Sequence, residues 1–400
     1  MTKTALSWAT LIVFGGILVS CDNNNVGQQM DDTDKAKSVE EKSKSAIEPG
    51  SKLPSNALDF RITGRALTLE NGMVKFAWPG VYIEAAFTGN TLGVVFGEDS
   101  QMGFNPGDNS VSYFDVNIDG QFHSTLIQPQ SEIWIKNIPD HGQAQHHIKI
   151  TKRNEAPTVI NNFKGFIPAP GKSVTIPQTE RDKSFVFIGD SYTAGYGLES
   201  DTRECTPEKV VATTNSTQTF AALTAKHFNA NYQQVAYSGR GLARNFGGAG
   251  GPTMSALYDK VFPWERSPRV ENAEAADVVV IGLGINDFST PISAQESWTE
   301  AGLEDAYRER YHALLDWVQQ YYEKPSAVVL SATWLGRDTA FAGLVQHVVE
   351  QRQAKGESNI VYWFYEGLDN EGCDWHPSAA DHRMLATKLT ELLRTRISVN

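Results

Sequence analysis

The chain lacks an excess of basic residues and a complete phosphate-binding motif. Its formal net charge is −12, so a nucleic-acid partner is not expected, because surfaces that bind nucleic acid are usually basic. The glycine cluster at 247–251 lacks the Gly-Lys-Ser/Thr ending of a phosphate-binding loop and is interpreted as a flexible active-site loop. The neighbours His146 and His147 would point to opposite faces of a strand, so no metal is assigned.

The N-terminus also lacks an apolar run long enough for an ordinary membrane span. Lys3 precedes a largely apolar stretch of limited length, residues 5–18. Residues 18–21, Leu-Val-Ser-Cys, resemble the lipobox of bacterial lipoproteins, which implies cleavage before Cys21 and diacylation of that cysteine. A plain signal peptide, or a signal anchor with an incidental cysteine, is the alternative. The prediction is an exported bacterial lipoprotein with residues 1–21 as its signal peptide, anchored in a membrane and facing the periplasm or cell exterior.

Cysteine is scarce, with three residues in the chain. If Cys21 carries lipid, Cys205 and Cys373 remain, and an oxidising compartment favours a disulfide between them. The alternative is two unpaired buried thiols.

The residue composition and the pattern of apolar residues change twice along the chain. Residues 22–56 are polar and contain no aromatic residue. Such a segment cannot bury enough apolar surface to fold, so it is predicted as a disordered tether. Residues 57–175 contain short β-rich stretches separated by turn residues, which predicts an all-β sandwich. The expected strands are 75–78, 81–87, 92–96, 112–118, 133–136 and 147–151.

Residues 182–400 alternate between short apolar strands and helical segments. Strands of this kind are typical of a parallel sheet that is covered by helices on both faces. The expected strands are 185–188, 232–236, 278–283, 327–331 and 360–364, and the expected helices are 217–228, 303–322, 341–353 and 379–397.

Residues suited to chemistry follow four of these five strands. Ligands of open parallel sheets bind outside the carboxyl ends of the strands. Ser191 follows the first strand, Gly239 the second, Asn286 the third and His376 the fifth. Together they supply a hydroxyl, a backbone amide, a carboxamide and an imidazole, which are the groups needed for acyl transfer with an oxyanion hole.

The chemistry assigns a role to each group. Ser191 is predicted as the nucleophile and His376 as the base that removes its proton, because the pKa of histidine lies near the operating pH. The oxyanion is expected to receive hydrogen bonds from the backbone N–H of Ser191 and Gly239 and from the side-chain amide of Asn286. Gly241 remains an alternative to Gly239. This chemistry requires no cofactor.

These blocks resemble those of the SGNH hydrolase superfamily. Gly189-Asp190-Ser191, Gly239, the Gly-x-Asn-Asp of residues 284–287 and His376 occur in the order of its four blocks. The sequence around Ser191 is not the Gly-x-Ser-x-Gly elbow of ordinary α/β-hydrolases.

The resemblance narrows to carbohydrate esterase family 2, the acetyl xylan esterases, and covers about residue 57 to the C-terminus. It implies a jelly-roll-like sandwich at 57–175, followed at 182–400 by an SGNH hydrolase domain with a parallel, flavodoxin-like sheet. It also implies removal of O-acetyl groups from a carbohydrate, with xylan or glucomannan as the polysaccharide. The matching stretches include residues 76–80, 185–197, 244–245 and 372–377.

The third member of a catalytic triad is open in this sequence. The SGNH pattern places an Asp three residues before the His, where this chain has Cys373, and the nearest acid is Asp374. Some family 2 members are thought to use a Ser–His dyad whose His is held by a backbone carbonyl. Either the Asp374 carboxylate or a carbonyl can fix the imidazole tautomer, but only the carboxylate would add charge stabilisation.

Other readings of the sequence also remain. Tyr192 and Trp375 either stack on a sugar ring or pack in the fold. His382 follows a predicted capping box at 378–381 and is interpreted as a surface or packing residue rather than the base. The alternatives to a carbohydrate deacetylase are an esterase or acyltransferase acting on another acyl ester or a bacterial glycan, and a carbohydrate-binding surface protein with a vestigial hydrolase domain.

Overall fold

A computed structural model describes residues 59–101, 111–139, 144–178, 181–271, 275–335 and 340–396. The signal peptide 1–21, the lipidation site Cys21 and the tether 22–56 lie outside the described residues. All described residues belong to one unit of dense internal contacts, residues 53–400. Among them, no helix combines the length and the apolar composition needed to cross a bilayer.

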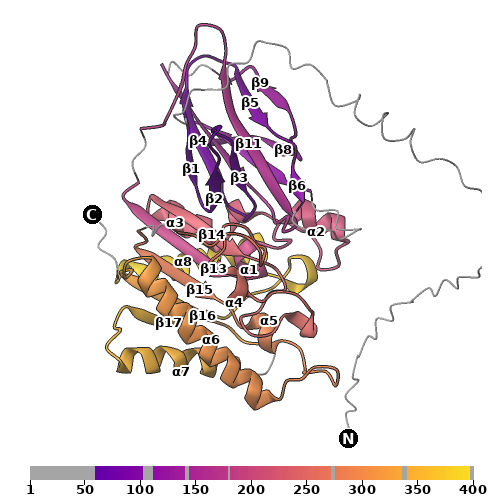
Figure 1. Ribbon diagram of the computed structural model, residues 1–400, viewed down its shortest axis with the longest axis vertical. Helices are drawn as coiled ribbons and strands as arrows, with labels where there is room; N and C mark the ends of the chain where they lie inside the picture. The colour runs from indigo at the N-terminus through magenta and orange to yellow at the C-terminus, as the bar shows by residue number, and fades with distance from the viewer. Residues whose placement is uncertain are drawn as a thin grey trace, which may run out of the picture. The chain divides into compact units, whose positions relative to one another are not determined.

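The N-terminal part consists of two antiparallel sheets (Figure 1). One has the strand order β1-β4-β10-β7-β8, with β12 beside β4, and the other has the order β2-β3-β11-β5-β9, with β6 beside β11. This arrangement confirms the predicted β-sandwich. The strands are β1 (Arg61–Thr63), β2 (Ala66–Thr68), β3 (Val74–Phe76), β4 (Tyr82–Phe87), β5 (Leu92–Phe96), β6 (Ser100–Gln101), β7 (Tyr113–Ile118), β8 (Gln121–Ile127), β9 (Glu132–Ile135), β10 (His146–Lys152), β11 (Val159–Pro168) and β12 (Val174–Thr175).

Aromatic side chains fill the space between these two sheets. Phe76 and Phe114 meet edge to face with ring centroids 6.0 Å apart, and Phe96 and Phe163 do so at 5.3 Å. All four side chains are almost fully buried. Such edge-to-face pairs add to the stabilisation that burial of the rings provides.

The C-terminal part is a five-stranded parallel sheet in the order β14-β13-β15-β16-β17. This is the flavodoxin-like order 2-1-3-4-5, so the predicted fold class is confirmed. The strands are β13 (Lys183–Gly189), β14 (Ala230–Ala236), β15 (Val278–Gly282), β16 (Ala327–Ala332) and β17 (Ile360–Phe364).

Helices cover both faces of this sheet. Val279 and Ile281 share a core with residues of α6 and α7, whereas Val280 and Phe187 share the opposite core with residues of α3 and α8. Alternate residues of one strand thus face different helices. The helices are α1 (Ser191–Ala194), α2 (Pro207–Thr213), η1 (Ser216–Gln218), α3 (Phe220–His227), η2 (Phe246–Gly248), α4 (Met254–Leu257), α5 (Ile285–Phe288), α6 (Glu300–Tyr321), α7 (Ala340–Ala354), η3 (Cys373–Trp375) and α8 (Ala379–Arg394).

Candidate active site

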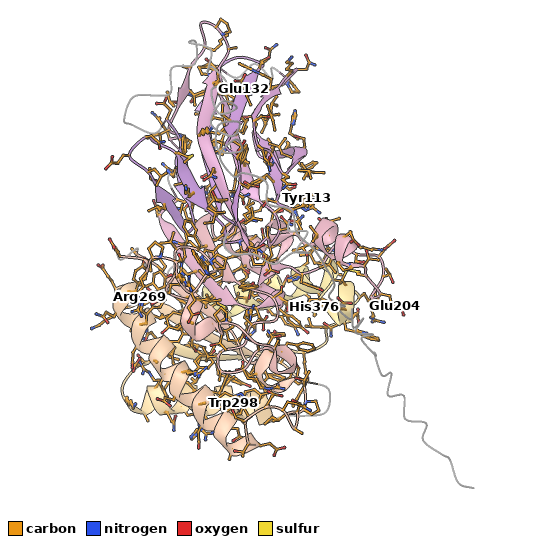
Figure 2. All side chains as sticks on the ribbon, turned by 45° about the vertical axis from the view of Figure 1, so that its right-hand side comes forward. Tyr113, Glu132, Glu204, Arg269, Trp298 and His376 are labelled. Carbon is orange, nitrogen blue, oxygen red and sulfur yellow. A yellow bond between two sulfur atoms is a disulfide. The ribbon has the colours of Figure 1, made fainter. Side chains whose placement is uncertain are left out.

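The candidate site lies at the carboxyl edge of the parallel sheet. Strand β13 has β14 on one side and β15 on the other, so the chain order reverses at β13 and ligands are expected beside it. The loops that follow β13, β14, β15 and β17 carry the four predicted groups. His376 is labelled in Figure 2, where it lies on the same side of the α/β part as Glu204.

Ser191 and His376 are in direct contact. The His376 Nε2 atom lies 2.9 Å from the Ser191 Oγ atom. Ser191 begins the short helix α1 immediately after β13, and the side chain of the preceding Asp190 caps this helix by accepting a hydrogen bond of 3.1 Å from the Tyr192 N–H. Ser191 is 5% exposed. The strand–helix turn therefore holds the hydroxyl in place beside the imidazole.

The other ring nitrogen of His376 contacts two backbone carbonyls. Its Nδ1 atom is 2.9 Å from the Cys373 oxygen and 3.2 Å from the Asp374 oxygen. Carbonyls only accept hydrogen bonds, so Nδ1 carries the proton and Nε2 is left free to accept one from Ser191. Burial lowers the pKa of His376 below its ordinary value, which favours the neutral form that acts as a base.

No hydrogen bond or ion pair joins the Asp374 carboxylate to His376 in this structure, so the two carbonyls rather than this carboxylate hold the imidazole here. The Asp374 Oδ2 atom accepts a 2.8 Å hydrogen bond from the Tyr196 hydroxyl instead. Asp374 and Trp375 both have left-handed backbones, with φ of 51° and 63°. This turn presents the carbonyls of residues 373 and 374 to the imidazole and directs the Asp374 side chain elsewhere.

The three predicted oxyanion donors differ in their hydrogen-bond partners. Asn286 is 5% exposed, and its Nδ2 atom donates to the Arg240 oxygen at 3.1 Å and to Asp190 Oδ2 at 3.3 Å. In the described part of the chain, no hydrogen bond from the backbone N–H of Ser191 or Gly239 to another protein group is found. Those two donors remain available to an oxyanion.

The structure distinguishes Gly239 from Gly241. Gly239 has a φ of 76°, and a side chain at this position would meet no atom within 4 Å. Gly241 is enclosed, since a Cβ there would lie 2.0 Å from the Arg244 oxygen. The geometry therefore favours Gly239 as the donor at the open site and makes Gly241 a packing residue.

A buried carboxylate shapes the loop after β14. Asp287 accepts hydrogen bonds of 2.6–2.8 Å from three successive backbone N–H groups, those of residues 242–244. Burial raises the pKa of Asp287 to about 6. Arg244 of the same loop forms a salt bridge with Glu296 and donates to the Asp287 carbonyl. These contacts give Asp287 a structural role in the loop.

The sequence and the fold of this chain are similar to those of carbohydrate esterases. Residues 62–177 match the carbohydrate esterase 2 N-terminal family, and residues 187–384 match the GDSL-like lipase/acylhydrolase family. An acetylxylan esterase / glucomannan deacetylase of Cellvibrio japonicus is 31% identical over 80% of this chain and 85% of its own. The chain belongs to carbohydrate esterase family 2. It is a carboxylic ester hydrolase, as the members of this family are.

Solved structures of family 2 esterases superpose on this chain. A carbohydrate esterase whose active site has divergent catalytic and non-catalytic binding functions is 29% identical, with a TM-score of 0.73, over 86% of this chain and 99% of its own. A family 2 esterase of Clostridium thermocellum, solved with cellohexaose, is 26% identical, with a TM-score of 0.71, over 84% and 98% of the two chains.

A disulfide fixes the His376 loop of this family 2 esterase. Cys205 and Cys373 are bonded, with their Cα atoms 5.4 Å apart. The Asp374 N–H also donates to the Arg203 oxygen at 2.6 Å. Left-handed backbone is unfavourable for residues such as Asp374 and Trp375 and persists where surrounding contacts impose it. The disulfide and this hydrogen bond are such contacts.

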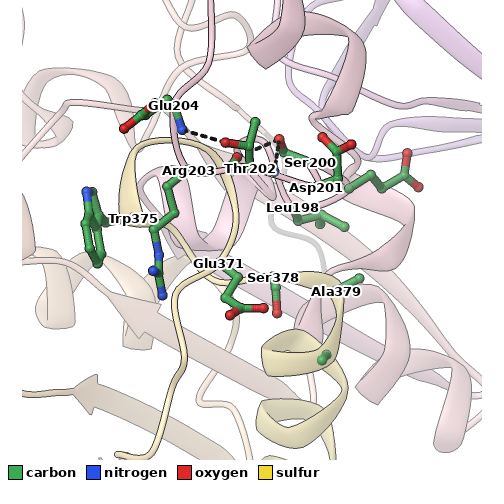
Figure 3. A pocket seen from close by; sticks show the side chains of 12 residues that line it. Leu198, Ser200, Asp201, Thr202, Arg203, Glu204, Glu371, Trp375, Ser378 and Ala379 are labelled. Atoms are coloured by element: carbon green, nitrogen blue, oxygen red, sulfur yellow. Dashed lines mark hydrogen bonds between the residues drawn. The ribbon is translucent and has the colours of Figure 1, made fainter.

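Trp375 is exposed at the edge of a hollow beside the site (Figure 3). Its side chain is 65% exposed, and the Arg203 guanidinium lies 4.1 Å from its ring centre. The hollow has a volume of about 660 Å³ and is lined by polar residues that include Thr202, Glu204 and Glu371. Tyr192 is half-buried, and its ring packs against His376 at 5.7 Å. Trp375 thus lines an open hollow, whereas Tyr192 packs against His376.

Tyr196 is a site residue that the sequence analysis did not identify. Its ring lies 4.3 Å from the His376 imidazole, centre to centre, and its hydroxyl holds Asp374. The only local signal is its position in the block after Ser191. His382, by contrast, is buried and accepts a hydrogen bond from the Phe220 N–H at 3.2 Å, which excludes it as the base.

Metal ligation has no basis in the described residues. No group of three or more His, Cys, Asp and Glu side chains in that part of the chain could hold an ion. His146 contacts Asp119 at 2.7 Å, while the neighbouring His147 faces Glu84.

Proposed function

We propose that this esterase removes O-acetyl groups from a polysaccharide, with Ser191 as nucleophile and His376 as base. The observation that carries the proposal is the 2.9 Å contact between His376 Nε2 and Ser191 Oγ, on a ring whose Nδ1 is held by carbonyls. This arrangement supplies an acceptor for the hydroxyl proton without a carboxylate partner.

The proposed reaction has two halves. Nε2 takes the Ser191 proton as Oγ bonds to the acetyl carbonyl carbon, and the carbonyl electron pair moves onto oxygen, where the N–H groups of Ser191 and Gly239 and the Asn286 amide would stabilise it. Collapse expels the sugar oxygen, which receives the proton from Nε2. Water, deprotonated by His376, then attacks the acetyl-Ser191 ester in the same way, releasing acetate and restoring the hydroxyl.

Two features support a carbohydrate substrate. The relative from Cellvibrio japonicus is named for acetylxylan and glucomannan, and a structural relative was solved with cellohexaose. In this chain, the aromatic side chain of Trp375, one residue from His376, is largely exposed. We propose acetylated xylan or glucomannan as the substrate class.

The test measures acetate released from acetylated xylan, acetylated glucomannan and p-nitrophenyl acetate by wild type and by Ser191→Ala. We expect the variant to lose at least about a thousandfold in rate on every active substrate. Equal rates for the two proteins would contradict the proposal. Binding of wild type to xylan without acetate release would instead indicate a carbohydrate-binding protein, and activity only on other acyl esters would exclude the polysaccharide.

We also propose that the chain is exported and anchored through a lipid on Cys21. The Cys205–Cys373 disulfide supports export, because such bonds persist in oxidising compartments. Metabolic labelling with a palmitate analogue should mark wild type and not Cys21→Ala. Labelling of both proteins, or of neither, would contradict the anchor.

A further inference from the structure

A loop of the β-sandwich reaches the catalytic part of the chain. This loop, residues 153–156, follows β10, which ends at Lys152. The Arg153 carbonyl accepts a 2.6 Å hydrogen bond from the Ser216 N–H, and the Lys152 carbonyl accepts one of 2.9 Å from the Ser216 hydroxyl. The Arg153 guanidinium forms a salt bridge with Glu199. The loop is therefore attached to the α/β part by several independent bonds.

The same loop is fixed from the sandwich side. Asn154 is fully buried; its side chain accepts a 2.8 Å hydrogen bond from the Tyr113 N–H and donates one of 2.7 Å to the Val111 oxygen. The buried Lys152 Nζ atom donates to the Asn154 carbonyl at 2.9 Å. Buried and satisfied polar groups of this kind hold a backbone in one conformation. Glu155 follows directly after this fixed segment.

The Glu155 carboxyl group accepts two hydrogen bonds from Ser238, the residue that precedes Gly239. One carboxyl oxygen accepts a 2.7 Å hydrogen bond from the Ser238 N–H, and the other accepts one from the Ser238 hydroxyl. The contact joins residues 83 positions apart in the sequence. A carboxyl group that accepts hydrogen bonds from two donors of one residue restricts both the position and the orientation of that residue.

The hydrogen bonds between Glu155 and Ser238 affect the backbone orientation of Gly239. The peptide N–H of Gly239 belongs to the bond that leaves Ser238, so its direction depends on how Ser238 is held. On the other side, the Gly239 carbonyl accepts a 3.0 Å hydrogen bond from the Phe246 N–H. With a φ of 76°, Gly239 adopts a conformation that glycine reaches without strain but does not itself enforce. Neighbouring contacts must therefore set the direction of the N–H.

We infer that Glu155 is a positioning residue that aims the Gly239 N–H at the oxyanion, so that the β-sandwich contributes to the catalytic site. This inference rests on the proposed Ser191 esterase activity. It assigns the sandwich a role in catalysis that does not depend on binding glycan. The role belongs to the geometry of the two hydrogen bonds rather than to the negative charge, since a charge close to a developing oxyanion opposes it.

The test compares substitutions at Glu155 with a matched interface control. Glu155→Ala removes both hydrogen bonds and should lower kcat about 10- to 100-fold with KM within about twofold, as expected when a contact made in the transition state is weakened. Glu155→Gln should retain kcat within about threefold, because its amide can accept from the Ser238 N–H and donate to the hydroxyl. Tyr82→Phe removes the 2.9 Å bond from Tyr82 to Asn231, another contact between the two parts, and should leave kcat unchanged.

Amide hydrogen exchange gives a readout that does not require activity. The peptide spanning 237–245 should exchange faster in Glu155→Ala than in wild type or in Tyr82→Phe. If Glu155→Ala does not fold, Glu155→Asp replaces it: this side chain keeps the charge, is too short to bridge both donors, and should lose more activity than Glu155→Gln.

Three outcomes would overturn the inference. The first is that kcat and amide exchange in Glu155→Ala or Glu155→Asp equal those of wild type. The second is that kcat falls equally in the Glu155 variant and in Tyr82→Phe. The third is that kcat falls further in Glu155→Gln than in Glu155→Asp. A wild type no faster than Ser191→Ala would instead reject the proposed function, so the two failures are distinguishable, and the exchange result still decides whether Glu155 orders the loop.

Discussion

The carbonyl oxygen of Cys373 lies 2.9 Å from His376 Nδ1, and the sulfur of the same residue is bonded to Cys205. One residue thus provides both the acceptor that fixes the imidazole tautomer and the covalent cross-link that fixes its own position. In a Ser–His–Asp triad, a carboxylate orients the histidine. Here a cross-linked backbone turn takes over that orientation.

Breaking the disulfide should affect both stability and catalysis. Cys205→Ser leaves the Cys373 carbonyl in place but removes a bond between residues 168 positions apart. The loop-entropy model gives a loss of up to about 5 kcal/mol in the free energy of unfolding. We also expect kcat to fall, because His376 is less tightly held. Urea unfolding and kcat of wild type under reducing conditions should match the variant; an unchanged stability would contradict this prediction.

Neutralising Asp374 should have little effect on the reaction. An Asn at 374 can still accept the Tyr196 hydrogen bond, and no hydrogen bond or ion pair joins the carboxylate to His376. We expect kcat of Asp374→Asn to stay within about tenfold of wild type, against a loss of at least about a thousandfold for His376→Ala. A loss of similar size in both variants would restore Asp374 as a catalytic acid.

Asn286→Ala removes the side-chain donor that we propose for the oxyanion hole. Loss of one such donor lowers kcat about 10²- to 10³-fold, or about 2.7–4 kcal/mol in the barrier. KM should change little, because the hydrogen bond strengthens in the transition state. Steady-state kinetics on p-nitrophenyl acetate give both constants, and a loss confined to KM would show that Asn286 binds substrate instead.

Gly239→Ala and Gly241→Ala form a matched pair in one loop. A Cβ at 239 meets open space but requires a left-handed residue, so we expect about 1 kcal/mol of destabilisation together with a clear loss of kcat. A Cβ at 241 would lie 2.5 Å from Asp287 Oδ2, so the larger loss of stability is expected there. Thermal unfolding of both variants tests this order, and the reverse order would contradict it.

The pH profile should report the lowered pKa of His376. The base must be neutral to accept the Ser191 proton, so kcat/KM is lost as the pH falls through this pKa. Because burial lowers the pKa, the midpoint should lie below the ordinary histidine value of about 6.5. A midpoint above that value would mean that the imidazolium is stabilised, as a carboxylate partner would do.

Sequence patterns predicted the parallel sheet well, because its strands are short, apolar and buried on both faces. The strand predicted at 360–364 coincides with β17 of this sheet, and the strand predicted at 92–96 coincides with β5 of the sandwich. Strand β11 was missed, because the buried polar pair Asn161 and Asn162 interrupts its apolar pattern. Strand β8 was missed because its outer position leaves most of its side chains exposed.

The four groups of the site could be predicted because each follows a strand of the parallel sheet. The residues that hold these groups in position could not be predicted. Tyr196 and Glu155 act through partners 178 and 83 positions away in the chain. No local pattern encodes such a distance. The choice between the Asp374 carboxylate and a carbonyl also depended on two left-handed residues, 374 and 375, which composition does not reveal.

The hydrogen bonds from Ser216 to the Arg153 and Lys152 carbonyls should couple the unfolding of the two parts of the chain. The change of pattern near residue 180 separates two architectures, but hydrogen bonds and buried side chains run across it. The sandwich and the α/β part should therefore melt in a single cooperative transition. An isolated segment 182–400 would expose the surface around Ser216 and would leave Ser238 without its Glu155 partner. We therefore expect this segment not to be fully active without the sandwich.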